Sequence, residues 1–136
     1  LKSGQLDGFR YTDRLFDRQQ LAEFVETASW LPLVEDGDAA VSLNGKGSIH
    51  LSKSARGSCS LSSEWRDDLG NSCFRPCLLP PPRFIRKSYG ECHPIQVAFA
   101  HDGRTAVIRY REDGVSFTYD LEYGRVMQVQ DLWRKP

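Results

Sequence analysis

The sequence predicts a single α+β domain: one amphipathic helix packed on an antiparallel sheet of six or seven strands, arranged as a β-meander or half-barrel. Three observations predict it: evenly spaced apolar runs near the C-terminus, glycine turn signals between them, and one helical apolar stripe near the N-terminus. The 136 residues form one domain, 1–136, and are enough to bury a core without a metal or cofactor.

The C-terminal third carries the strongest strand pattern. Its apolar runs are separated by the turn signals Asp102-Gly103, Asp113-Gly114 and Tyr123-Gly124. Glycine accepts the positive φ that a tight hairpin turn demands, so this pattern predicts consecutive antiparallel strands. The four expected strands are 95–101, 105–111, 115–121 and 125–130.

The helix is expected at residues 17–30. Asp17 is a good N-cap, and Gln20 three residues later completes a capping box. Pro32 is expected to end the helix near Trp30. The residues of its apolar stripe are Leu21, Phe24, Val25 and Ala28.

The middle of the chain predicts further strands. Residues 40–43 and 48–52 flank an Asn44-Gly45 turn signal and are expected to form a second hairpin. Residues 58–65 are expected to form another strand, followed by a turn at 66–71. Three consecutive prolines at 80–82 favour an extended segment, since they cannot donate to a sheet.

Four cysteines lie in the middle third of the chain. An even number in a loop-rich stretch predicts two disulfides, and therefore an oxidising compartment, periplasmic or extracellular. A hairpin could place Cys59 opposite Cys73 or Cys77. Zinc binding and free buried thiols remain as alternatives, although the usual zinc-ligand spacing is missing. The cysteines are Cys59, Cys73, Cys77 and Cys92.

Composition excludes two classes of partner. The formal net charge is zero and the pI is about 7, so no overall field favours nucleic acid. No run approaches the roughly 18 apolar residues of a membrane span. Because the chain begins at Leu1 rather than Met, we expect that an N-terminal segment, such as a signal or lipid anchor, has been removed.

No catalytic constellation or metal-ligand set is recognisable. His50 and His93 have no partner at a familiar spacing, and His101-Asp102 is interpreted as a local hydrogen-bonding corner rather than a dyad. We therefore expect no catalytic residues, no metal and no cofactor. An enzyme of unfamiliar type built on Asp67, Asp68, His101 or Asp102 remains an alternative.

A small domain without catalytic groups is expected to work by binding. The segment 83–91, between the prolines and Cys92, contains residue types that are enriched at protein interfaces. A loop held by disulfides and prolines loses little entropy when a partner docks. An alternative is a small apolar ligand on the concave face of the sheet. The expected partner-binding residues are Arg83, Phe84, Arg86, Ser88, Tyr89 and Glu91.

The hairpins from Asp102-Gly-Arg to Tyr119-Asp-Leu-Glu-Tyr-Gly-Arg125, with the small size and the mid-chain cysteines, resemble bacterial periplasmic immunity proteins. In type VI secretion systems such proteins neutralise a toxin that attacks the cell wall or membrane. The resemblance covers mainly residues 95–132. It implies a β-rich fold and an inhibitor that plugs the active-site cleft of a secreted hydrolase toxin with a loop.

Overall fold

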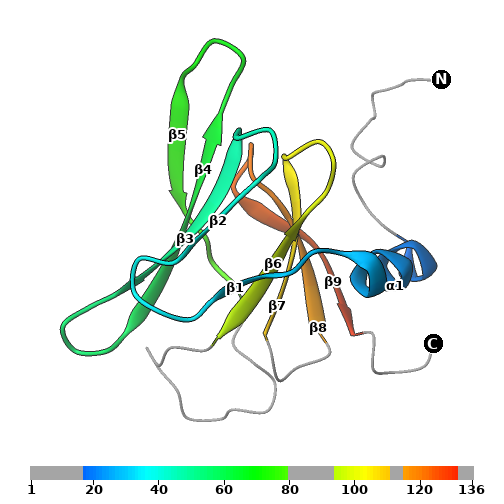
Figure 1. Cartoon of the computed structure of the whole chain (residues 1–136), viewed down its shortest axis with the longest axis horizontal. Helices are drawn as coiled ribbons and strands as arrows, with labels where there is room; N and C mark the ends of the chain where they lie inside the picture. Colours follow the sequence, from blue (N-terminus) through cyan, green and yellow to red (C-terminus); the bar gives the residue numbers. More distant parts are fainter. Residues whose placement is uncertain (1–16, 80–93, 111–114, 132–136) are drawn as a thin grey trace.

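The computed structural model describes residues 17–79, 94–110 and 115–131, which form one helix and nine strands in two antiparallel sheets (Figure 1). The five-stranded sheet has the order β1-β6-β7-β8-β9, and the four-stranded sheet has the order β2-β3-β4-β5. The elements are α1 (Arg18–Thr27), β1 (Leu31–Leu33), β2 (Ala39–Val41), β3 (Gly47–Lys53), β4 (Cys59–Arg66), β5 (Ser72–Pro76), β6 (Ile95–Phe99), β7 (Thr105–Tyr110), β8 (Val115–Asp120) and β9 (Arg125–Asp131).

The predicted mixture of one helix with antiparallel strands is confirmed, but the expected single sheet is not. The predicted hairpin at 40–52 pairs with β4 rather than with the C-terminal meander, so β2–β5 form a sheet of their own. The two sheets face each other and bury their apolar sides together (Figure 1). A sandwich is the usual solution when two sheets each have one apolar face.

The main core lies between the sheets. Ile49 and Leu51 of β3 are buried with Ile108 of β7 and with Phe117 and Tyr119 of β8. The Tyr119 hydroxyl is buried too, and it shares a hydrogen bond of 3.0 Å with Ser63 Oγ of the other sheet. This bond meets the requirement that a buried hydroxyl keep a partner.

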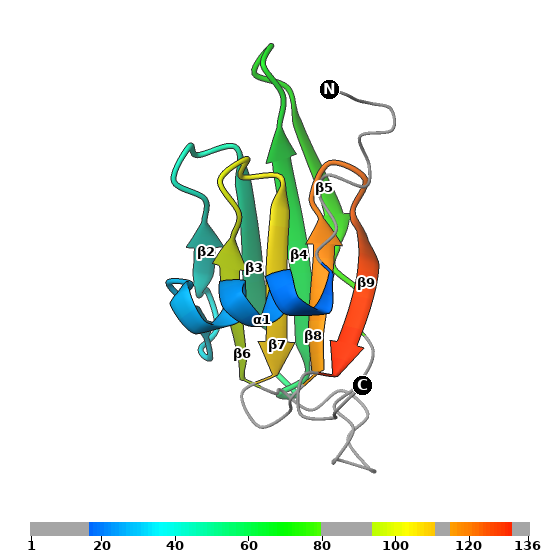
Figure 2. The same cartoon turned by 90° about the vertical axis from the view of Figure 1, so that its right-hand side faces the viewer.

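Helix α1 lies across the outer face of the five-stranded sheet, in front of β6, β7 and β8 (Figure 2). Its predicted capping box is confirmed: Gln20 N donates to Asp17 Oδ1 at 2.7 Å, and Asp17 N donates to Gln20 Oε1 at 3.0 Å. The helix ends at Thr27, three residues earlier than expected, because Ala28 is already extended with ψ 149°. No helix in the described part of the chain is long and apolar enough to cross a membrane.

Four of the turns between strands gather at one end of the sandwich (Figures 1 and 2). We call this end the turn end. It comprises the β2–β3 turn (42–46), the β4–β5 turn (67–71), the β6–β7 turn (100–104) and the β8–β9 turn (121–124). The β3–β4 turn (54–58) lies at the opposite end.

Candidate functional site: a ring of turns at one end of the sandwich

The β6–β7 turn is shaped by a single carboxylate. Asp102 Oδ1 accepts hydrogen bonds from the backbone N–H groups of Arg104 and Thr105, both at 2.9 Å, and Oδ2 accepts one from Thr105 Oγ1 at 3.1 Å. The prediction of a hydrogen-bonding corner at Asp102 is therefore confirmed. All three bonds are made within the turn, so the carboxylate stabilises the shape of the turn.

The β6–β7 turn is joined to the β2–β3 turn through Asn44. Asn44 Nδ2 donates to the backbone oxygen of Asp102 at 3.0 Å, and Asn44 Oδ1 accepts from Ser42 Oγ at 2.7 Å. Gly103 has φ 69°, and a Cβ at this position would collide with the Asn44 side chain. The predicted turn glycine thus serves both the backbone conformation and the contact between the two turns.

The β6–β7 turn is joined to the β8–β9 turn by a buried ion pair. Arg104 donates to Asp120 from Nε at 3.1 Å and from Nη2 at 3.0 Å, and its Nη1 lies 2.8 Å from Glu122 Oε1. Asp120 is only 2% exposed, and its Oδ1 also accepts from the N–H groups of Glu122 and Tyr123. Burial alone would lower the pKa of Arg104, but the hydrogen bonds and charges of Asp120 and Glu122 raise it.

Two further contacts close the ring. Arg75 of β5 donates from Nη1 to the backbone oxygen of Tyr123 at 3.3 Å, which joins the β4–β5 hairpin to the β8–β9 turn. Lys46 pairs with Asp68, which joins the β2–β3 turn to the tip of the same hairpin. The other three turns are therefore each bonded to two neighbours, and the β4–β5 hairpin is bonded to two through Asp68 of its turn and Arg75 of its strand β5. Groups linked in this way lose little conformational freedom when a partner binds.

The β4–β5 hairpin projects beyond the rest of the turn end (Figures 1 and 2). Asp67 organises its tip, accepting from the N–H groups of Leu69 and Asn71 at 2.9 Å each. The hydrogen bond from Asn71 contributes most to holding the pKa of Asp67 below its ordinary 3.8. The turn leaves Leu69 87% exposed at the tip, and Phe74 is 66% exposed on the flank.

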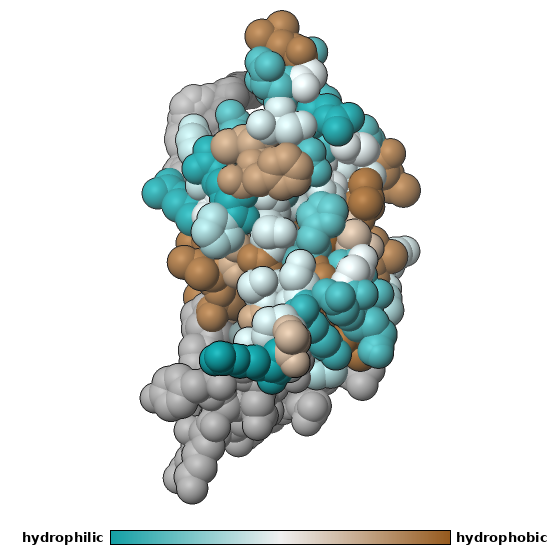
Figure 3. All heavy atoms as spheres, turned by 90° about the vertical axis from the view of Figure 1, so that its left-hand side faces the viewer, coloured by the Kyte–Doolittle hydropathy of each residue, from teal (hydrophilic) through white to brown (hydrophobic). Residues whose placement is uncertain are grey.

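Exposed apolar side chains recur around the ring. Leu43 is fully exposed in the β2–β3 turn, Leu69 lies in the β4–β5 turn, and Tyr123 is half exposed in the β8–β9 turn. By contrast, hydrophilic residues dominate the outer face of the β2–β5 sheet, where a hydrophobic group marks the hairpin tip (Figure 3). Apolar residues held out on rigid turns are typical of a recognition surface.

The predicted disulfide framework is only partly correct. Cys59 is disulfide-bonded, but Cys73 and Cys77 are free thiols, and Cys92 lies outside the described residues. The β4–β5 register places Cys73 opposite Trp65, and the Cys77 N–H bonds to Leu61, so neither faces Cys59. Cys77 is buried in the core, and burial raises the pKa of its thiol to about 12.

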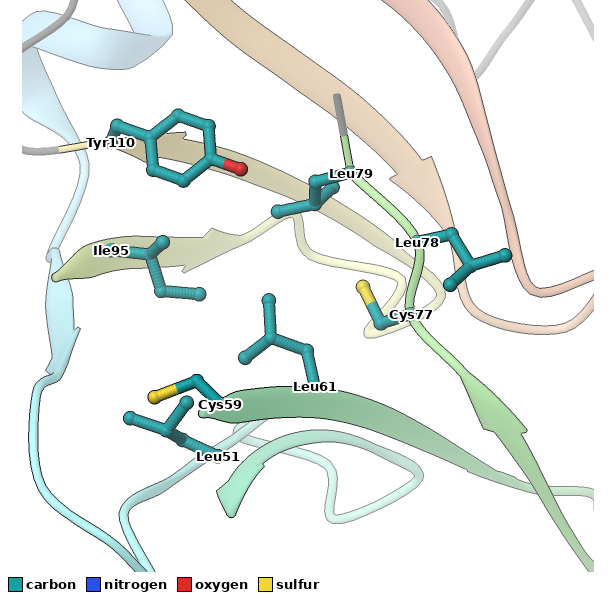
Figure 4. A pocket seen from close by; sticks show the side chains of 8 residues that line it. All are labelled: Leu51, Cys59, Leu61, Cys77, Leu78, Leu79, Ile95 and Tyr110. Carbon is teal, nitrogen blue, oxygen red and sulfur yellow. The ribbon is translucent and has the colours of Figure 1, made fainter. Parts of the chain in front are cut away.

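The predicted partner-binding segment lies outside the part of the chain that the structure describes. Arg83, Phe84, Arg86, Ser88, Tyr89 and Glu91 all lie outside the described residues, as does the expected turn at Asp113-Gly114. Leu79, the last described residue before this segment, and Ile95, the first residue of β6 after it, both line a cavity between the sheets at the end opposite the turn end (Figure 4).

We call that opposite end the cavity end. The cavity has a volume of about 200 Å³ and is lined by apolar side chains together with Cys59, Cys77 and Tyr110 (Figure 4). Sites for small ligands usually measure about 300–1,000 Å³, so this cavity is smaller than the usual ligand site. The remaining concave surface of the five-stranded sheet is filled by the second sheet, so Phe117 and Tyr119 pack in the core rather than around an open bowl.

One polar cluster was not anticipated from the sequence. On β3 and β4, Ser48 Oγ lies 2.8 Å from His50 Nε2 and 3.5 Å from Glu64 Oε1, while Glu64 Oε1 lies 3.9 Å from the same His50 nitrogen. A catalytic triad needs the carboxylate on the other imidazole nitrogen, so this geometry does not form one. The sequence signal that could have predicted this cluster is the two-residue alternation of a strand, which places residues 48 and 50 on one face.

Among residues 17–79, 94–110 and 115–131, no group of three or more His, Cys, Asp or Glu side chains is placed to hold a metal ion. The comparisons with known proteins add no relative: no family model, curated protein or solved structure matches this chain.

Proposed function

We propose that this protein is a binding or inhibitor protein that engages a protein partner through its turn end. The observation that carries the proposal is the closed ring of contacts among four turns, three of which hold an apolar side chain out to solvent. Such a surface offers anchors that are fixed before the partner arrives. Preorganisation of this kind raises affinity by lowering the entropy lost on binding.

The projecting β4–β5 hairpin is the element suited to enter a cleft. Leu69 supplies an apolar apex, Asp67 fixes the turn beneath it, and Phe74 extends the apolar surface down one side. Insertion of this hairpin would be the loop insertion that the resemblance to immunity proteins implies. The proposed partner is a secreted hydrolase toxin, met in the periplasm or outside the cell.

The charges of the turn end favour binding to one specific partner over non-specific attraction to charged molecules. Lys46 pairs with Asp68, and Arg104 pairs with Asp120 and Glu122, so both signs of charge are present in the ring. Mixed charge of this type favours recognition of one complementary face over broad attraction to a polyanion. It agrees with the zero net charge of the chain.

The test begins by mixing the protein with the products of genes adjacent to its own and isolating any stoichiometric complex. Affinity is then measured by calorimetry for Leu69→Ser and Phe74→Ser. Val129→Ser is the matched control, because Val129 is an exposed apolar residue on β9, outside the hairpin. We expect each hairpin variant to bind at least about tenfold more weakly than the control, because exposed apolar anchors dominate interfaces.

Two results would contradict the proposal. Equal affinity of the hairpin variants and the control would remove the turn end from the interface. Turnover of a substrate by the isolated chain, retained in both hairpin variants, would replace a binding function with an enzymatic one.

A further inference from the structure

Strand β5 is the last strand of the four-stranded sheet, and in the described part of the chain it pairs with β4 alone (Figure 1). The Cys77 N–H bonds to the backbone oxygen of Leu61 at 2.8 Å, so the odd-numbered residues of this ladder form its hydrogen-bonded pairs. Because such pairs alternate, the backbone groups of Ser72, Phe74 and Pro76 point away from β4, along the outer edge of the sheet.

This edge can pair with another strand, but only over a defined length. Ser72 and Phe74 each offer an N–H and a C=O, whereas Pro76 offers only a C=O because proline has no N–H. On the other side of Ser72, the turn at Gly70 ends the extended backbone. The edge therefore admits one strand of matching length and stops the pairing from continuing into a larger sheet.

A second copy of β5 matches this edge. When two β5 strands run antiparallel about a twofold axis at Cys73, Ser72 of each copy lies opposite Phe74 of the other, and each pair exchanges both of its backbone hydrogen bonds. The two Cys73 residues then face each other as a non-hydrogen-bonded pair, with their Cα atoms about 4.5 Å apart. A disulfide needs a Cα separation of about 4.4–6.8 Å, and Cys73 is an exposed free thiol.

The side chains of the paired strands are compatible on both faces of the sheet. On one face the two Phe74 residues become diagonal neighbours at about 7–8 Å, which aromatic side chains can span. Phe74 is 66% exposed in the single chain, so pairing covers an apolar surface. On the other face Arg75 lies opposite Asn71 of the second copy, so no like charges face each other. An axis at Phe74 would instead place Cys73 opposite Arg75 and leave both thiols unpaired.

We propose that β5 is a self-association edge, at which two copies of the chain pair strand to strand and are locked by a disulfide between their Cys73 residues. The oxidant is a low-molecular-weight disulfide such as oxidised glutathione. The Cys73 thiolate of one copy attacks it and releases one glutathione thiolate, and Cys73 of the second copy then attacks the mixed disulfide and releases the other. Two protein thiols are oxidised to one disulfide, one glutathione disulfide is reduced to two glutathione molecules, and the two thiol protons pass to these.

The paired form covers Phe74, which belongs to the hairpin proposed above to enter a partner's cleft. Pairing and hairpin insertion therefore exclude each other, and the pair is a resting form of the protein. The self-association itself does not depend on the proposed function, because the experiment below measures it with no other protein present.

The experiment follows dimer formation by the full chain in oxidised glutathione on non-reducing gels, and mass spectrometry identifies the linked peptides. We expect a dimer joined through Cys73. It should form at least about tenfold faster than in the double variant Cys73→Ser, Leu69→Cys, because strand pairing raises the effective concentration of the Cys73 thiols alone. This variant is a matched control, since Leu69 is an exposed position of the same hairpin that the axis does not bring together with its copy.

A second variant tests the strand pairing without changing the thiol. Ser72→Pro removes an outward N–H from each copy, and an edge strand tolerates proline at such a position, so circular dichroism should show an unchanged fold. Dimer formation should slow at least about tenfold, because each copy loses one hydrogen bond of the paired edge. In the wild-type dimer, the amides of Ser72 and Phe74 should exchange at least about tenfold more slowly than in the reduced chain.

Two results would overturn the proposal. The first is a monomer that only carries glutathione at Cys73. The second is a dimer that forms equally fast in the wild type, in Ser72→Pro and in the Leu69→Cys control, since that would mean chance collision of exposed thiols.

Discussion

The two ends of the sandwich are closed in different ways. At the turn end, polar side chains cross from each turn to its neighbours, and Asn44, Arg75 and Arg104 occupy the spaces between them. At the cavity end, apolar side chains surround a space of about 200 Å³. The same antiparallel strands run between the two ends, so the difference comes from the side chains that follow each strand.

This contrast predicts which end of the sandwich binds a partner and which end tolerates substitutions. Directional contacts fix a surface in one arrangement, which suits binding, but they make it sensitive to small changes. Apolar packing is not directional, and filling a cavity commonly stabilises a protein.

Removing the buried carboxylate of the ring should be the most damaging change. Asp120→Ala leaves Arg104 without its main partner and exposes two turn N–H groups, so we expect the free energy of unfolding to fall by about 3–5 kcal/mol. Glu122→Ala removes the more exposed partner of the same arginine and should cost at most about 1 kcal/mol. Urea unfolding followed by circular dichroism measures both. Equal losses would show that the buried pair does not hold the turns.

A single methyl group should disturb the contact between two turns. Gly103→Ala meets both a positive φ and the Asn44 side chain, so we expect a loss of about 2–3 kcal/mol in the free energy of unfolding. Gly45→Ala meets only the positive φ, with open space around it, and should lose about 1 kcal/mol. The same urea experiment compares them. If the two variants lose the same amount, the packing of Gly103 on Asn44 contributes nothing.

At the cavity end, added volume should have the opposite sign. Leu61→Phe extends a side chain that lines the cavity, and we expect it to raise the free energy of unfolding by about 0.5–1 kcal/mol. The measurement is again urea unfolding, with Leu51→Ala, a buried residue of the same wall, as a destabilising reference. A loss of stability in Leu61→Phe would mean that the cavity end is packed as tightly as the turn end.

The smallest effect concerns acid and the hairpin tip. The pKa of Asp67 is depressed in the folded state, so its stabilising hydrogen bonds are complete above pH 3.8 and are lost as the pH falls through the lower folded pKa. We expect the amide resonances of Leu69 and Asn71 to shift together in this range. In Asp67→Asn both shifts should disappear. Persistence of the shifts in that variant would assign them to another group.

Local structure could be read from the sequence where one residue type decides it. Asp17 with Gln20 predicts the helix start, and Asn44-Gly45, Asp102-Gly103 and Tyr123-Gly124 predict three of the four turns at the turn end. These signals work because capping and positive φ depend on neighbours along the chain. The corner at Asp102 was predicted for the same reason.

Tertiary arrangement was harder to predict. No local sequence signal predicts that β2–β5 form a second sheet. The apolar face of a strand can pack on another sheet or on a helix, and its sequence pattern is the same in both cases. The disulfide prediction was only partly correct because the register of one hairpin, with Cys73 opposite Trp65, decides which cysteines meet. The ring itself joins residues far apart in sequence, such as Asn44 with Asp102 and Arg75 with Tyr123.

The most direct test of the ring is hydrogen exchange at the turn glycines. The amides of Gly45, Gly70, Gly103 and Gly124 each donate a hydrogen bond within their own turn, and so does Gly57 in the β3–β4 turn at the cavity end, which Ser54 and Ser58 close locally. If cross-turn contacts hold the turn end rigid, its four glycine amides should exchange at least about tenfold more slowly than the Gly57 amide. They should also lose protection together in Asp120→Ala. Exchange as fast as that of Gly57, or loss confined to the β8–β9 turn, would contradict a preorganised binding end.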